Sequence, residues 1–172
     1  SVLWMLSQNE LASKNLKKEA RLRNVDPKRI IFAEFMKMPN HLARYKAADL
    51  FIDTFPCGAH TGTVDALWAG LPVLTRMGES FASRVAGSLL NAIGLSELIT
   101  YTKKEYENKA IELASNVKLL EEIKNKLNKN KNTEPLFNTE LFTNNLESAY
   151  KEIYKKYLSS KKPSNLEIKI EN

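Results

Sequence analysis

A turn rich in small and hydroxylated residues joins an apolar run to a helical pattern at residues 53–70, which read DTFPCGAHTGTVDALWAG. The helix is expected to open at His60, Thr61, Gly62 and Thr63. Free N–H groups and the positive end of the helix dipole favour an anion at such an opening. The threonine hydroxyls and the His60 ring can add further hydrogen-bond donors. The turn therefore predicts a phosphate site.

Asp65 follows about one turn after Thr61, where a carboxylate can reach past the bound anion. A carboxylate accepts hydrogen bonds in pairs from vicinal hydroxyls, so a ribose is its expected partner. Phosphate together with ribose indicates a nucleotide. Two plainer interpretations stay open. In the first, Thr61 or Thr63 serves only as the N-cap of the helix. In the second, Asp65 only complements the helix dipole.

A second group of residues, His41 and Arg44, lies at the start of the preceding helical pattern. Residues three apart share a helix face, and a planar imidazole beside a planar guanidinium can stack on a heterocyclic base or bond to it. The alternative is an ordinary pair of exposed surface side chains. Because loops of adjacent parallel strands lie side by side, this pair and the turn at 56–63 are expected to border one crevice.

The elements that must position these residues are short apolar runs alternating with helical patterns up to about residue 100. This alternation predicts an α/β fold, a Rossmann-like parallel sheet with helices on both faces. Strands are expected at 1–7, 29–35, 49–55, 72–76 and 97–100, and helices at 10–23, 40–47, 61–70 and 80–93. Val64, Leu67 and Trp68 are expected on the core side of the helix at 61–70. Gly70 is expected to end that helix, with Pro72 opening the next strand.

After Thr100 the chain becomes rich in Lys, Glu and Asn, and 103–131 predicts one or two exposed helices. A last amphipathic helix is expected at about 139–158, carrying Tyr154 and Tyr157 on its apolar side. We expect one domain over 1–158 and a mobile tail over 159–172.

Composition excludes several function classes. The 172 residues include 43% hydrophobic residues, enough for a core, but no run long enough for a membrane span. One cysteine and two histidines make a metal centre unexpected. The net charge of +6 is spread among interleaved Lys and Glu, so no nucleic-acid partner is expected. The start of the chain lacks the marks of a signal peptide, and a cytoplasmic location is expected.

The longer stretches together resemble one family. "DTFPCGAHTGTVDALWAGLPVLT", "GESFASRVAGSLL" and "PLFNTELFTNNLESAY", with the opening Ser1-Val2-Leu3-Trp4, are similar to the C-terminal half of the catalytic region of O-linked N-acetylglucosamine transferases. These are SPINDLY-like glycosyltransferases of family 41 and of the two-domain GT-B type. The resemblance extends to about residue 157.

This resemblance implies binding of a uridine diphosphate sugar, with transfer of N-acetylglucosamine to Ser or Thr of proteins without a metal or cofactor. It assigns the diphosphate to His60, Thr61 and Gly62, the ribose to Asp65, and the uracil to His41 and Arg44. Relatives commonly carry a second threonine where this chain has Gly62, so one hydroxyl donor is missing unless Thr63 replaces it through a small shift of the turn. His60 is also expected to assist the leaving diphosphate.

The resemblance further implies that the acceptor side, the catalytic base and the helical repeats that recruit substrate proteins lie upstream of Ser1. We therefore expect a donor-binding half that is inactive alone. The alternatives are a non-catalytic nucleotide-binding or protein-interaction module and a GT-B nucleotide-sugar epimerase relative. In the resembling enzymes the closing helix packs toward the other domain, so the isolated chain is expected to expose Tyr154 and Tyr157 and to form a homodimer through them.

Overall fold

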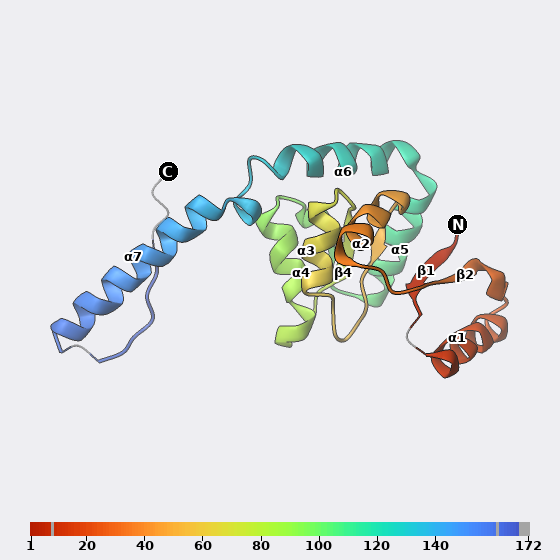
Figure 1. The fold of residues 1–172 in the computed structure, drawn as a ribbon, viewed down its shortest axis with the longest axis horizontal. Coiled ribbons are helices and arrows are strands. Elements are labelled where there is room, and N and C mark those ends of the chain that lie inside the picture. Colours follow the sequence, from red (N-terminus) through yellow and green to blue (C-terminus); the bar gives the residue numbers. More distant parts are fainter. Residues whose placement is uncertain (8, 161, 169–172) are drawn as a thin grey trace.

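The computed structural model describes residues 1–7, 9–160 and 162–168. It confirms the α/β class, with five parallel strands and seven α-helices in this part of the chain (Figure 1). The strands are β1 (Leu3–Leu6), β2 (Ile30–Ala33), β3 (Phe51–Ile52), β4 (Val73–Arg76) and β5 (Ile99–Thr100). The helices are α1 (Glu10–Leu22), α2 (Met38–Arg44), α3 (Thr61–Trp68), α4 (Val85–Ala92), α5 (Lys103–Ser115), α6 (Val117–Asn130) and α7 (Thr139–Leu158).

The strands form two separate parallel sheets rather than the single sheet expected. In the first, β1 pairs with β2 from Leu3 opposite Ile30 to Leu6 opposite Ala33. In the second, β4 lies between β3 and β5. β1, β2 and β3 are shorter at both ends than the apolar runs suggested, and β4 and β5 only at their first end, because only part of each run pairs. In a doubly wound sheet two runs of strands lead outward from a central position. Here both groups of strands are present, but no described strand of the first sheet pairs with a strand of the second.

The hydrophobic core lies where α3 and α4 pack with β4. Its fully buried side chains include Leu67, Leu90 and Leu98. The Lys-rich region 103–131 forms two helices, and one face of each belongs to this core, because Leu113 and Leu127 are buried in the same cluster. The expectation of exposed helices was therefore wrong for that face.

Side chains at the C-terminal end of α6 donate hydrogen bonds to carbonyls at the C-terminal ends of α3 and α4. Gly70 and Gly94 take positive φ angles of 86° and 71° after their helices, as glycine does at a helix C-terminus. Asn130 Nδ2 donates to the carbonyl of Ile93 at 2.8 Å, and Lys131 Nζ donates to that of Trp68 at 3.2 Å. The predicted stop at Gly70 is thus confirmed.

Trp68 is the exception on α3, because its side chain is 58% exposed rather than buried. Its ring meets Phe137 edge to face, with centroids 5.1 Å apart. Thr63, Ala66 and Leu67 supply the buried face of the helix instead. Thr63 and Ala66 are small and not strongly apolar, so the sequence pattern favoured the large apolar Trp68 for the buried face.

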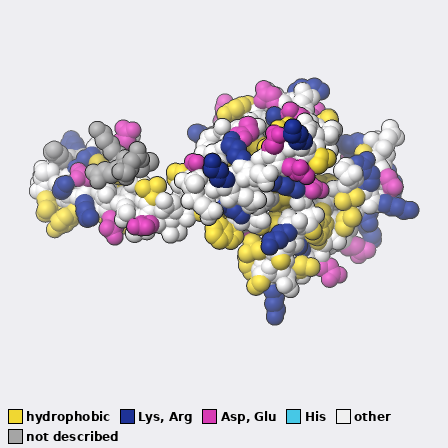
Figure 2. Space-filling view, turned by 90° about the horizontal axis from the view of Figure 1, so that it is seen from above, with side chains coloured by type: hydrophobic (Ala, Val, Ile, Leu, Met, Phe, Trp, Pro, Cys, Tyr) yellow, Lys and Arg dark blue, Asp and Glu magenta, His cyan; other side chains and the backbone are white. Residues whose placement is uncertain are grey.

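The last helix, α7, extends from the body as an arm, on the side opposite β1, α1 and β2 (Figure 1). The predicted exposure of Tyr154 and Tyr157 is confirmed, at 61% and 76%. Figure 2 shows hydrophobic atoms at the far end of this arm, and acidic and basic side chains interleaved over the visible face of the body. Residues 162–168 lie in no helix or strand. The mobile tail, whose positions 161 and 169–172 lie outside the described residues, and the domain boundary at 158 stay predictions.

Candidate functional site

The start of α3 offers main-chain donors. His60 is the N-cap residue, and its side chain makes no capping bond. The N–H groups of Thr63 and Val64 donate to the His60 carbonyl at 3.1 and 3.3 Å. The N–H groups of His60, Thr61 and Gly62 have no acceptor among the described residues. Three consecutive free amides at the positive end of a helix form an arrangement suited to an anion.

The two threonines of this helix start differ. Thr61 is exposed, and its side chain makes no hydrogen bond with the described residues. Thr63 is fully buried, and its hydroxyl donates to the carbonyl of Ala59 at 2.9 Å. Neither residue is the N-cap, so that plainer interpretation was wrong. The hydroxyl and amide protons of Thr63 are both used in this arrangement, so its role as the replacement donor requires a shift of the turn and stays a prediction.

The imidazole of His60 is held by the loop that follows β4. Its Nε2 lies 3.3 Å from the carbonyl oxygen of Ala82, and its ring meets Phe81 edge to face at 5.8 Å. A carbonyl oxygen only accepts, so Nε2 carries the hydrogen, and Nδ1 of the neutral ring is an acceptor. His60 can therefore donate to an anion from Nδ1 when the ring is protonated, or from Nε2 when it leaves Ala82.

His41 and Arg44 contact each other, as their spacing on α2 predicted. Arg44 Nη2 lies 2.7 Å from His41 Nδ1, and Arg44 Nη1 donates to the Glu34 carbonyl at 2.9 Å. The guanidinium also lies over the Trp4 ring, 5.9 Å from its centroid. Because a guanidinium only donates, Nδ1 of His41 is the acceptor, and the hydrogen of the neutral ring is on Nε2.

Tyr45, which the sequence did not single out, packs against this pair. Its hydroxyl lies 3.3 Å from His41 Nε2, and the two rings are 5.0 Å apart. Burial raises the pKa of Tyr45, the negative charge of Asp65 raises it further, and Arg44 lowers it. The strands before these two groups, β2 and β3, lie in different sheets and are not neighbours in one sheet as expected.

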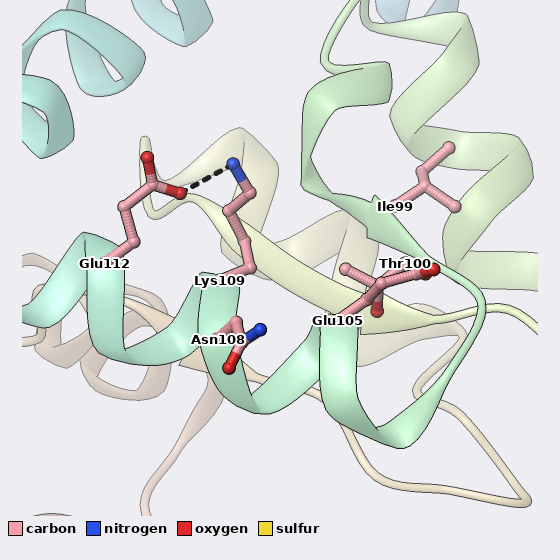
Figure 3. A pocket seen from close by; sticks show the side chains of 6 residues that line it. All are labelled: Ile99, Thr100, Glu105, Asn108, Lys109 and Glu112. Carbon is pink, nitrogen blue, oxygen red and sulfur yellow. Dashed lines mark ion pairs between the residues drawn. The ribbon is translucent and has the colours of Figure 1, made fainter.

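A surface hollow lies away from these residues. It has a volume of about 470 Å³ and runs beside β5 and α5, lined by Ile99, Thr100, Glu105, Asn108, Lys109 and Glu112 (Figure 3). Its charged side chains are already partnered, since Lys109 Nζ pairs with Glu112 at 2.8 Å and Glu105 caps the start of α5. It contains none of the predicted site residues, so the chemistry favours the start of α3.

No helix in 1–7, 9–160 or 162–168 is long and apolar enough to cross a membrane. Over the same residues, no group of three or more His, Cys, Asp or Glu side chains is arranged to hold a metal ion.

Known proteins resemble the chain over most of its length. The family model described as glycosyl transferase family 41 matches residues 1–146. A probable UDP-N-acetylglucosamine–peptide N-acetylglucosaminyltransferase, SEC of Arabidopsis thaliana, is 35% identical over 169 residues, covering 98% of this chain and 17% of the relative. The UDP-N-acetylglucosamine–peptide N-acetylglucosaminyltransferase of Caenorhabditis elegans is 33% identical over 159 residues, covering 92% and 14%.

A solved structure agrees with both. A mutant of the Thermobaculum terrenum O-GlcNAc transferase superposes with a TM-score of 0.83 at 28% identity, covering 92% of this chain and 31% of that one. The chain therefore spans less than a third of the length of each of these proteins. With the family model, the two relatives and the fold in agreement, the chain belongs to glycosyl transferase family 41.

Proposed function

We propose that this chain is the donor-binding half of a protein O-glycosyltransferase that moves N-acetylglucosamine from a UDP-sugar to Ser or Thr of proteins. The observation that carries the proposal is the row of three free amides at the start of α3, on the helix that also carries Asp65. Family membership supports the reaction class, because both relatives are named as transferases of N-acetylglucosamine to peptide.

In this proposal the pyrophosphate accepts hydrogen bonds from the amides of His60, Thr61 and Gly62. Asp65 accepts from the ribose hydroxyls. The uracil lies toward His41 and Arg44. Negative charge grows on the diphosphate as the sugar leaves, and fixed amides with a helix dipole stabilise that charge without having to reorient. Neither a metal nor a cofactor is needed for this step.

We propose that the catalytic base, the acceptor protein contacts and the helical repeats belong to other parts of the full protein. Transfer then requires those parts, and the 172-residue chain alone binds the donor without turning it over. We also propose that the full protein works in the cytoplasm, with no nucleic acid as partner.

Calorimetric titration with UDP tests the site. We expect Asp65→Asn and His60→Ala each to weaken UDP binding by about 1–3 kcal/mol, the range for hydrogen bonds that involve charged groups. Asp49→Asn is the matched control, because Asp49 is an exposed carboxylate paired with Lys124. It should bind UDP like wild type. Equal affinity in all four proteins would remove Asp65 and His60 from the site.

The exposed apolar arm α7 favours one competing candidate, a protein-interaction module that has lost transfer. Restoring the upstream half and assaying sugar transfer separates the two. Transfer supports the enzyme, and binding of UDP without any transfer supports the module. Epimerised free donor would instead indicate the epimerase relative.

A further inference from the structure

Asp53 lies just after β3 and is not among the residues that the sequence assigns to a ligand. Its side chain is buried, with 6% of the residue exposed. Oδ1 accepts from the amides of Thr54 at 2.8 Å and Ala59 at 2.7 Å, and Oδ2 accepts from the hydroxyl of Thr75 at 2.7 Å. One carboxylate thus joins both ends of the loop before α3 to the central strand β4.

These bonds decide which amides of the loop are free. The N–H of Ala59 is used by Asp53, and that of Gly58 donates to the Ala82 carbonyl at 2.9 Å. The next amide, that of His60, is the first of the three without an acceptor in the described part of the chain. The amides of Phe55 and Cys57, earlier in the loop, also have no acceptor there, but Ala59 is the residue directly before the three free amides at the start of α3, and Asp53 holds it.

The fit around this carboxylate is close. A Cβ added to Gly58 would lie 2.9 Å from Asp53 Oδ2. On the other side, the hydroxyl of Tyr106 donates to the Asp53 main-chain carbonyl at 2.7 Å. Both the side chain and the main chain of Asp53 are thus fixed. Its charge is met by two amides and a hydroxyl, so a second anion can bind nearby at less electrostatic cost.

We propose that Asp53 is a positioning residue, which holds Ala59 so that the amides of His60, Thr61 and Gly62 converge on the pyrophosphate of the donor. Asp53 does not touch the ligand and acts through the main chain of the loop. This inference rests on the proposed function, because it takes the UDP diphosphate as the group that those amides bind.

The experiment compares UDP with uridine, which lacks the diphosphate, by NMR titration of the 172-residue chain. Asp53→Ala should weaken UDP binding about tenfold, a change of about 1.4 kcal/mol, and leave uridine within about twofold. Asp53→Asn should recover most of the UDP affinity, because its amide oxygen still accepts from Thr54 and Ala59 while its NH₂ group can donate to the Thr75 oxygen.

Thr75→Val and Thr100→Val form the matched pair. Both threonines are buried on neighbouring strands, but Thr75 donates to Asp53, whereas Thr100 donates to the Thr75 carbonyl at 2.9 Å. Both variants should lower Tm. Only Thr75→Val should lower the ratio of UDP to uridine affinity, by about threefold to tenfold. If Asp53→Ala does not fold, this pair decides the question.

A purely structural role predicts that Tm falls and that both ligands weaken together. An unchanged UDP-to-uridine ratio in Thr75→Val and in whichever Asp53 variants fold, with UDP still bound by wild type, would overturn the positioning role and leave the proposed function standing. Failure of wild type to bind UDP would overturn the proposed function and this inference with it.

Discussion

Gly58→Ala probes the packing of the loop before α3 most directly. The new Cβ would lie 2.9 Å from Asp53 Oδ2 and 3.4 Å from the Ala82 carbonyl oxygen. Neither neighbour can move freely. The carboxylate is fixed by three hydrogen bonds, and the Ala82 carbonyl already accepts from the Gly58 amide.

The cost follows from that crowding. A methyl group forced into a well-packed site typically destabilises a protein by about 1–3 kcal/mol. For a chain of this size each kcal/mol lowers Tm by about 2–4 °C, so we expect Tm to fall by roughly 2–12 °C. The conformational restriction of alanine in the unfolded chain offsets about 0.4–1 kcal/mol of this cost, which makes the lower part of the range the more realistic one.

Gly62→Ala is the control four residues further along. Its added Cβ would meet only the Ala59 Cβ, at an ordinary contact distance of 3.7 Å. Alanine is a better helix former than glycine, so we expect this variant to gain about 0.4–1 kcal/mol. Urea unfolding of both variants beside wild type measures the difference. Equal stability of Gly58→Ala and Gly62→Ala would show that the loop yields, and would refute the rigid arrangement around Asp53.

Three further predictions concern the rest of the fold. Leu127→Ala should cost about 2–5 kcal/mol in urea unfolding, because Leu127 is fully buried, whereas Leu11→Ala at an exposed position should stay within about 0.5 kcal/mol; equal costs would contradict the shared core. Burial, and then the charge of Asp53, raises the pKa of Tyr106, so above about pH 10 the unfolded chain releases a proton that the folded chain keeps. The free energy of unfolding should fall as the pH rises over that range, and that of Tyr106→Phe should fall less steeply. Parallel curves of stability against pH for the two proteins would argue against Tyr106 as the titrating group. Light scattering should detect a dimer at high concentration that Tyr154→Glu with Tyr157→Glu abolishes, and a wild-type monomer would count against α7 as the contact.

The order and type of the elements could be predicted from the sequence because they depend on local patterns. Alternating apolar runs and helical patterns gave all five strands, and Gly70 marked the end of α3 correctly. The separation into two sheets could not be predicted in the same way. Pairing depends on which strands lie side by side, and an apolar run such as 1–7 carries no record of its neighbour.

The candidate site divides similarly. That His60, Thr61 and Gly62 bind an anion stays a prediction. Their free amides follow from where α3 begins, and the turn residues in the sequence indicated that start. Asp53 was missed because its partner Thr75 is distant in sequence, and Tyr45 because nothing in the sequence shows that its hydroxyl faces His41. Asp53 did leave a weak signal, an acidic residue directly after an apolar run with small residues following, where burial requires partners for its oxygens.

The burial of side chains from α5 and α6 in the same core cluster as those of α3 and α4 sets the smallest piece that can be exchanged between relatives. Composition changes at Thr100, which makes that position an inviting junction for a chimera. A junction there would place foreign side chains in the core cluster that Leu67 and Leu90 now share with Leu113 and Leu127. Such a hybrid would keep every residue of the nucleotide site and still lose its fold, so grafting experiments should transfer these four helices together.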